Sequence, residues 1–210
     1  MIDKLFINGI DIQEEYGFFL GWKIISMPTI KTNYQTIAGA DSVIDLTKAN
    51  GRVFYNQRTI QLNMIHPSDL YQEDLDALMA FHGETCKISF ESDAAHYFSG
   101  MIVVNSYDTK THKLSMTASV YPYRFEKALT EFTVKNNRTI VISNDTMPVV
   151  PKVDVVGGTV TLAWKNYSKS LSAGSYYIDE LYIDKKGSVS ISATFGTADS
   201  VKISFRKGCL

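Results

Sequence analysis

Hydrophobic residues alternate with polar residues along most of the chain, which is the pattern of β-strands with one buried face. The clearest example runs from Leu114 to Tyr121, where Leu, Met, Ala and Val alternate with Ser and Thr. Near the N-terminus, two apolar runs flank Asn8-Gly9, a dipeptide that favours a type I′ turn, so a β-hairpin is predicted over residues 5–12. Other short apolar runs predict strands at Trp22–Ile25, Thr32–Ile37, Thr59–Ile65, Cys86–Phe90 and Met101–Tyr107.

One segment has helical spacing instead. Between Pro67 and Gly83, apolar residues recur at positions i, i+4, i+7 and i+8 of one stripe: Tyr71, Leu75, Leu78 and Met79. Ser68 or Asp69 can cap the start of this helix, and Gly83 can end it in a left-handed conformation. The sequence therefore predicts a single helix over about residues 68–83, with its apolar stripe packed on a sheet.

The character of the chain changes after Pro122-Tyr123-Arg124. From about Thr130 onward every apolar run is strand-like, and turns that contain Gly separate the runs. The expected strands are Phe132–Val134, Thr139–Ile142, Val153–Val155, Val160–Trp164, Tyr176–Asp179, Leu181–Asp184, Val189–Ala193 and Val201–Phe205. We therefore predict a mainly β protein with two domains: residues 1–127, a β-sandwich with one helix packed on it, and residues 128–210, a small β-sandwich.

Composition and charge narrow the classes of function. The chain has 210 residues, of which 45% are hydrophobic and 20% charged, and this excludes a disordered chain. Its net charge of −1 leaves no overall basic field for nucleic acid or an anionic membrane. The balance is uneven, with 11 basic and 15 acidic residues in 1–127 but 10 and 7 in 128–210. The two domains therefore face different surroundings or attract each other.

The N-terminal sequence and the lengths of the apolar runs indicate where in the cell the protein is made. Asp3, Asp11, Glu14 and Glu15 interrupt any apolar signal segment, and no apolar run approaches the length of a membrane-spanning helix. We therefore expect synthesis in a cytoplasm and no association with a membrane.

The residues do not converge on a catalytic or metal site. The four histidines are scattered and have no recognisable partner motif: His66, His82, His96 and His112. Cys86 falls on the buried side of an alternating strand and Cys209 near the chain end, so a disulfide is not expected. Paired carboxylates such as Asp41 with Asp45 suit a glycosidase in residue type alone, and any β protein has such pairs. We expect no enzymatic activity, no metal and no cofactor.

The second domain carries aromatic residues of the kind that stack on sugar rings: Trp164, Tyr167, Tyr176, Tyr177 and Tyr182. The interpretation that we favour places Trp164 in the core and the tyrosines on ordinary strands. If the domain binds sugar, Tyr167 in the turn after Trp164 is the best stacking candidate. Tyr176 or Tyr177 would assist, because adjacent strand residues face opposite sides.

The stretch from Thr32 to Leu62 resembles the siphophage distal tail (Dit) protein family. In that family a strand leads into a G-x-D-G-x-[LI]-D-L-T turn and then a Tyr-x-x-Arg strand. The matching positions here are Gly39, Asp41, Ile44, Asp45, Leu46, Thr47, Tyr55 and Arg58, and Ser42 replaces the family's common glycine. The likeness continues to Pro122-Tyr123-Arg124 and so covers most of residues 20–125. A weaker likeness to the family's C-terminal sandwich covers Pro148 to Val155 and the last six residues.

This resemblance implies a structural protein of a phage or prophage tail tip, located in the virion and made in the bacterial host cytoplasm. N-terminal domains would form a hexameric hub ring that joins the tail tube protein to a tail-tip or tail-associated lysin protein. DNA would pass through its channel without specific binding, and the acidic balance of residues 1–127 predicts a neutral or negative channel. A galectin-like C-terminal domain would carry a receptor-binding protein or bind sugar.

Two other classes of function stay open from the residues alone. A carbohydrate-binding module or adhesin would be monomeric. A small polysaccharide hydrolase would turn over its substrate.

Overall fold

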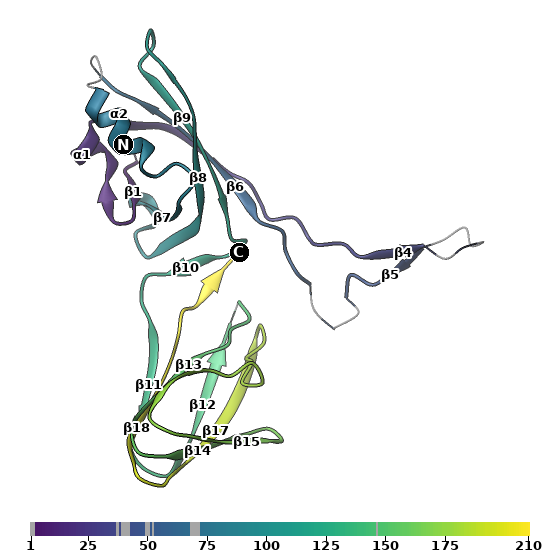
Figure 1. The fold of residues 1–210 in the computed structure, drawn as a ribbon. Helices are drawn as coiled ribbons and strands as arrows, with labels where there is room; N and C mark the ends of the chain where they lie inside the picture. Colours follow the sequence, from purple (N-terminus) through teal and green to yellow (C-terminus); the bar gives the residue numbers. More distant parts are fainter. Residues whose placement is uncertain are drawn as a thin grey trace. The chain divides into compact units, whose positions relative to one another are not determined.

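The computed structural model describes residues 3–36, 38, 43–48, 51, 53–67, 72–145 and 147–210. The chain forms two compact units, Met1–Arg124 with Leu210 (unit 1) and Phe125–Cys209 (unit 2). Strands account for 58% of the chain and helices for 8%, so the prediction of a mainly β protein is confirmed. Each unit is built around its own hydrophobic core (Figure 1).

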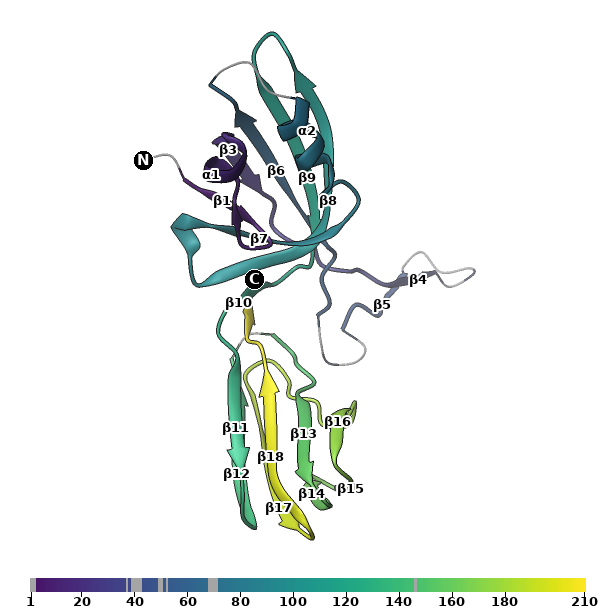
Figure 2. The same ribbon diagram turned by 60° about the vertical axis from the view of Figure 1, so that its left-hand side comes forward.

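Unit 1 is built on an antiparallel sheet whose main path has the strand order β2-β1-β7-β8-β9-β6-β3. Its strands are β1 (Leu5–Ile7), β2 (Ile10–Asp11), β3 (Phe19–Ile25), β6 (Arg58–Ile65), β7 (Thr85–Phe90), β8 (His96–Asp108) and β9 (Lys113–Val120). The first half of the long strand β8 pairs with β7, and its second half pairs with β9. Gly100 lies at this joint and pairs with both Cys86 and Val120. The two halves of the sheet enclose one core (Figure 2).

The alternation seen in the sequence places alternate residues of these strands in that core. On β9, Leu114, Met116, Ala118 and Val120 are fully buried, and the Ser and Thr residues between them face outward. The predicted hairpin is present as β1 and β2, with Asn8 and Gly9 at the positive φ angles of 52° and 89°. The buried faces of β6, β7 and β8 complete the core, as the alternation predicts.

The helical elements differ from the prediction of a single helix. They are α1 (Ile12–Tyr16), α2 (Gln72–Met79) and the 3₁₀ turn η1 (Glu91–Asp93). Ile12 begins α1 and does not extend the hairpin, because the Asp11 carboxylate caps the backbone N–H groups of Gln13 and Glu14. Gly17 then ends this helix at a φ of 70°.

The predicted helix over residues 68–83 is present as the shorter α2. It ends at Met79, and backbone hydrogen bonds of the i to i+3 type carry the chain on as a tighter turn to Gly83, whose φ is 82°. The predicted capping residues Ser68 and Asp69 lie outside the described residues.

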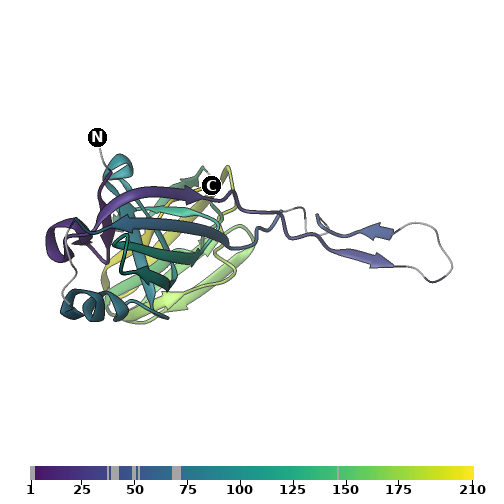
Figure 3. The same ribbon diagram turned by 90° about the horizontal axis from the view of Figure 1, so that it is seen from above.

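A long hairpin leaves the sheet as a continuation of β3 and β6 (Figure 3). We call its described residues, which are 26–36, 38, 43–48, 51 and 53–57, the arm. Near its base, the Ser26 N–H donates to the carbonyl of Thr59 at 2.9 Å. At its far end, β4 (Tyr34–Thr36) pairs with β5 (Val43–Asp45) in a separate two-stranded sheet. The strand predicted at Thr32–Ile37 is thus largely correct, but the segment expected to be a turn contains β5.

Unit 2 is a sandwich of two four-stranded sheets with the orders β11-β18-β13-β16 and β12-β17-β14-β15. Its strands are β11 (Thr130–Val134), β12 (Arg138–Asn144), β13 (Lys152–Gly157), β14 (Val160–Trp164), β15 (Tyr167–Leu171), β16 (Gly174–Tyr177), β17 (Gly187–Phe195) and β18 (Ala198–Phe205). The short strands β10 (Arg124–Glu126) and β19 (Gly208–Cys209) pair with each other. The predicted small sandwich is therefore confirmed.

One strand prediction in unit 2 is wrong, and one strand of unit 2 is not predicted. Residues Leu181–Asp184 do not form a strand: Ile183 makes an isolated bridge to Val149, and the apolar side chains of this connection are buried in the core. Conversely, β15 is a strand that the sequence does not predict. Its residues are mostly polar and exposed because β15 is an edge strand, and only Leu171 reaches the core.

Candidate functional site

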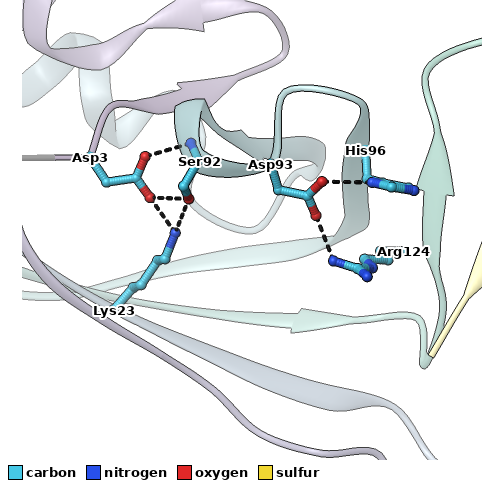
Figure 4. A network of polar contacts seen from close by, with 6 residues as sticks. All are labelled: Asp3, Lys23, Ser92, Asp93, His96 and Arg124. Atoms are coloured by element: carbon cyan, nitrogen blue, oxygen red, sulfur yellow. Dashed lines mark hydrogen bonds and ion pairs between the residues drawn. The ribbon is translucent and has the colours of Figure 1, made fainter.

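A network of polar contacts joins segments of unit 1 that are far apart in the sequence (Figure 4). Its side chains come from the N-terminal segment, β3, η1, β8 and the end of the unit: Asp3, Lys23, Ser92, Asp93, His96 and Arg124. Asp3 forms an ion pair with Lys23 and accepts hydrogen bonds from the N–H of Ser92 at 2.8 Å and its hydroxyl at 2.6 Å. The Asp93 carboxylate contacts His96 Nδ1 at 2.6 Å and Arg124 Nη1 at 2.7 Å.

The residue types Ser, Asp and His also occur in hydrolytic triads, in which the His accepts the hydroxyl proton of the Ser. Here the Ser92 hydroxyl donates to Asp3 and accepts from Lys23 at 3.0 Å, and His96 contacts Asp93. Figure 4 shows His96 pointing away from Ser92. The Ser92 hydroxyl is thus paired with the Asp3 carboxylate and the Lys23 ammonium group and not with His96, so the network ties chain segments together and lacks the Ser–His pair of a hydrolytic triad.

The electrostatics of the two acidic residues fit that structural role. Burial raises the pKa of Asp3, but hydrogen bonds from Lys23 and Ser92 outweigh it and leave the pKa below its usual value. Burial likewise raises the pKa of Asp93, and the contacts with His96 and Arg124 lower it to a net value below the usual range. Both groups are therefore carboxylates at neutral pH. The sequence does not predict this network, and the only local signal is the i, i+3 spacing of Asp93 and His96.

The residues of the family-like motif are dispersed in the structure. Tyr55 packs edge to face on Tyr123, with 6.1 Å between ring centroids. Arg58 is buried on the inner face of β6, and its guanidinium lies 4.7 Å from the centre of the Phe98 ring. Asp45 lies in the arm, where its Oδ1 accepts from the backbone N–H of Thr47 at 2.8 Å. Gly39 and Asp41 lie outside the described residues.

The aromatic residues of unit 2 divide between core and surface. Trp164 is only 3% exposed, and its indole N–H donates to the carbonyl of Glu180 at 3.0 Å, so its assignment to the core is correct. Tyr167 is 51% exposed and stacks on Trp164 with 5.9 Å between ring centroids, which leaves its other face open to solvent. Tyr177 is 71% exposed, whereas Tyr176 packs against the core.

The position of Tyr167 differs from the turn that we predict. It is the first residue of β15 and pairs with Trp164 across the turn. The structure places Tyr167 in one sheet and Tyr176 and Tyr177 in the other.

The arm exposes large apolar side chains at several of its described positions. Met27 is 82% exposed, and five further large apolar residues in the described part of the arm are about half exposed: Ile30, Tyr34, Val43, Ile44 and Phe54. Tyr34 and Val43 belong to two cross-strand pairs on one side of the ribbon, and the pair between them places Ile44 on the other side. Contiguous exposed apolar surface of this kind marks an interaction site. The sequence predicts a strand over Thr32–Ile37 but does not show that the apolar side chains of the arm are exposed.

The structure provides few features suited to small-molecule chemistry. One hollow of about 290 Å³ is lined by apolar atoms of Phe19, Leu20, Gly21, Ile65 and Pro67, without the convergent polar groups that orient a ligand. Within the described ranges, no three His, Cys, Asp or Glu residues gather in a way that could hold a metal ion. Cys86 and Cys209 do not form a disulfide. No helix among the described residues is long and apolar enough to cross a membrane.

Solved structures that resemble this chain include one that matches it over its full length. The Dit protein of SPP1 matches with a TM-score of 0.69, and the match covers 100% of both chains at 14% sequence identity. The chain shares the fold of that protein. SPP1 Dit is described as a paradigm of the hub adsorption apparatus in phages that infect Gram-positive bacteria. No protein-family model and no curated protein matches the sequence. The resemblance to distal tail proteins inferred from the sequence is thus confirmed at the level of the fold.

Proposed function

We propose that the protein is a structural component of a bacteriophage or prophage tail tip that assembles with further copies of itself into a hub ring. The full-length likeness to SPP1 Dit supports a role in a phage tail. The observation that carries the assembly is the arm, because a two-stranded ribbon is at best marginally stable alone in water. The exposed apolar side chains of this ribbon require a partner surface.

The finer features of this proposal come from the likeness to the distal tail family. Six copies would form the ring through a head-to-tail interface, which closes on itself when the rotation between copies is right. The ring would join the tail tube protein to a tail-tip or tail-associated lysin protein, and DNA would pass through its channel. Unit 2 would serve as the attachment domain for a receptor-binding protein, and the protein would be located in the virion tail tip after synthesis in the host cytoplasm.

A non-enzymatic role accords with this proposal. The similar solved structure is described as part of an adsorption hub and not as an enzyme. The Ser, Asp and His side chains of unit 1 that lie near one another are engaged in separate contacts.

Light scattering on a size-exclusion column tests the assembly. Six chains of 23.5 kDa would give a particle of about 140 kDa. Ile44→Lys places a charge on the exposed arm and should reduce the mass of the particle toward that of one chain. Val141→Lys alters a residue of unit 2 that is also exposed, and should leave the mass unchanged. A wild-type monomer at all concentrations would contradict the ring.

Binding of a neutral glycan by unit 2 is a second candidate function, and the open face of Tyr167 favours it. An aromatic ring held flat on a buried indole is a rigid stacking platform for a sugar ring. We expect Tyr167→Ala to abolish binding of host cell-wall polysaccharide, measured by calorimetry, while the far-ultraviolet circular dichroism stays unchanged. Tyr177→Ala tests whether the other exposed tyrosine contributes. If the wild-type protein binds no glycan in this experiment, attachment of another protein remains as the proposed role of unit 2. Hydrolysis of the polysaccharide would contradict both roles.

A further inference from the structure

In the described part of unit 2, four strands lie at sheet edges, and three of them have features that discourage the addition of another strand. The edge strands are β11 and β16 in one sheet and β12 and β15 in the other. β11 carries Glu131, which pairs with Lys202 on the neighbouring strand at 2.7 Å, and β15 carries Lys169. β16 has only four residues. Charged side chains and short strands are common means of protecting a sheet edge.

The fourth edge strand, β12, lacks these features. It runs over the seven residues Arg138–Asn144, and after Arg138 they include no charged residue and no proline. Its pairing with β17 stays in register over all seven residues, without a bulge. Among the described strands β12 pairs only with β17, so the N–H and C=O groups along its other edge have no backbone partner there. A strand of this kind is a template for an added strand.

The side chains of β12 define which segment fits this edge. Val141 is 62% exposed on the outer face, and the outward residues of the neighbouring strand β17 are serines and a threonine. On the inner face, Ile140 is 8% exposed and lies at the border of the core. An added strand would place alternate side chains next to Ile140 and next to Val141. Apolar residues fit the first positions and small uncharged residues fit the second, because neither set then buries an unpaired charge.

Arg138 adds a positive charge to one end of the edge. Its side chain is exposed, and no carboxylate among the described residues forms an ion pair with it. An acidic residue at this end of an added segment would pair with the guanidinium group. The opposite end differs, since Asp145, which follows the strand, already pairs with Lys207 at 3.5 Å. The segment that fits is therefore uncharged along most of its length and acidic at the end beside Arg138.

A segment of another protein suits this edge better than a second copy of the chain. Two sandwiches that meet edge to edge bury little beyond their two edge strands, whereas stable interfaces bury about 1,200 Å² or more in total. A partner that donates one segment to each copy is held at several points of the proposed ring. Repeated contacts of this kind raise the overall affinity without a larger area at each copy.

We propose that the free edge of β12 receives an extended segment of another protein, which pairs with it as an additional strand of the sheet. The segment has apolar residues at alternate positions and an acidic residue beside Arg138. The proposal rests on the attachment role proposed above for unit 2, and it names the surface and the form of the partner. Backbone hydrogen bonds supply the affinity, and the alternate side chains supply the specificity.

A synthetic peptide tests this pairing on the full chain. The probe has the sequence of residues 188–194 of β17, because β17 already pairs with the other edge of β12, followed by two glutamates that an antiparallel arrangement places beside Arg138. We expect the labelled probe to bind in fluorescence anisotropy. The same peptide with N-methylated backbone amides should bind at least tenfold more weakly, because it lacks the N–H donors of a strand. Two lysines in place of the glutamates should also weaken binding.

Two valine variants of unit 2 provide a matched comparison. Val141 on β12 and Val156 on the central strand β13 are exposed to 62% and 54%. We expect Val141→Lys to weaken binding of the probe at least tenfold and Val156→Lys to leave it unchanged, while light scattering gives both variants the mass of the wild type.

The outcomes separate this contact from the ring. If the wild type does not bind the probe, or if both valine variants bind it equally, the contact is wrong and the ring proposal is unaffected. A wild-type mass that Val141→Lys halves would show that a second copy occupies the edge, and would also overturn the contact. A monomeric wild type that binds the probe with the expected differences contradicts the ring and supports the contact.

Discussion

Gly100 shows how a single residue permits the architecture of unit 1. It lies where β8 passes from its pairing with β7 to its pairing with β9. A Cβ atom there would lie 2.1 Å from the carbonyl oxygen of Ser119 and 2.5 Å from Cα of Val120. Both are backbone atoms, so they can yield only if the strands separate. The glycine is required by this close approach of two strands.

We therefore predict that Gly100→Ala destabilises unit 1 by about 2 kcal/mol or more, the cost of forcing extra volume into a packed site. Urea denaturation of the full chain measures the effect, with the fluorescence of Trp22 in unit 1 and Trp164 in unit 2 as probes. Gly21→Ala is the control, because a Cβ atom there would lie 3.3 Å from its nearest neighbour. Equal unfolding midpoints for the two variants would contradict the prediction.

The ionisation of Asp93 makes the stability of unit 1 depend on pH. Its pKa is lower in the folded protein than the usual 3.8. Such a carboxylate stabilises the fold above its unfolded pKa, and the contribution is lost as the pH falls through the folded pKa. We expect Asp93→Asn to lower the free energy of unfolding at pH 7 by roughly 0.5–1 kcal/mol, as for a partly exposed ion pair.

The difference from the wild type should shrink below about pH 4, and thermal melts between pH 7 and pH 3 would measure it. Asp108→Asn is a comparison outside the network, because the pKa of Asp108 is lowered by hydrogen bonds within its own turn. A difference for Asp93→Asn that grows as the pH falls would have the wrong sign for this explanation.

At the scale of the element, the short helix α1 depends on interactions at its ends for its stability. It has only five residues, too few to be stable from helix propensity alone. The Asp11 carboxylate accepts from the N–H groups of Gln13 and Glu14 at 3.0 and 3.3 Å and also pairs with Lys4 at 2.7 Å. Ile12 anchors the helix in the core, where it is fully buried. The cap therefore fixes where the hairpin stops and the helix begins.

We expect Asp11→Ala, which removes this cap, to lower the free energy of unfolding by about 1 kcal/mol. Asp11→Asn retains a capping oxygen but loses the ion pair with Lys4, so we expect a smaller loss. Chemical denaturation at pH 7 distinguishes the two variants. If both lose the same free energy, the ion pair and not the cap determines the stability of this element.

At the scale of the whole molecule, charge governs the relation to DNA. The net charge is −1, and residues 1–127 carry 11 basic and 15 acidic side chains. Binding to duplex DNA gains most of its affinity from neutralised phosphates, so this protein lacks the main source of that affinity. DNA that passes through the proposed ring would not adhere to such surfaces.

We predict that the assembled wild-type protein does not shift duplex DNA in a gel at low salt. A variant with Thr59→Lys, Gln61→Lys and Thr117→Lys adds three positive charges to outward positions of β6 and β9. Tested as free chains, it should bind DNA with an affinity that falls as salt rises. Tight, salt-dependent binding by the wild type would contradict the interpretation of the charge pattern.

The sequence alone determined the features that depend on neighbouring residues. Alternation identified the two mainly β units and placed Trp164 in a core, and Asn8-Gly9 identified the first hairpin. The backbone geometry of a strand or turn is local, so its signal is present in a few consecutive residues. The order of motifs between residues 20 and 125 also indicated the family whose fold the structure resembles.

Only the tertiary structure decided features that depend on what lies beside a residue in space. Asp3, Lys23 and Ser92 are distant in sequence and meet because β1, β3 and η1 are brought together. The polar strand β15 has no buried face to mark it, since it lies at a sheet edge. The apolar residues of the arm look like core residues in the sequence, and only the fold shows that they are exposed. Burial is a property of the whole packed chain, and no local pattern contains it.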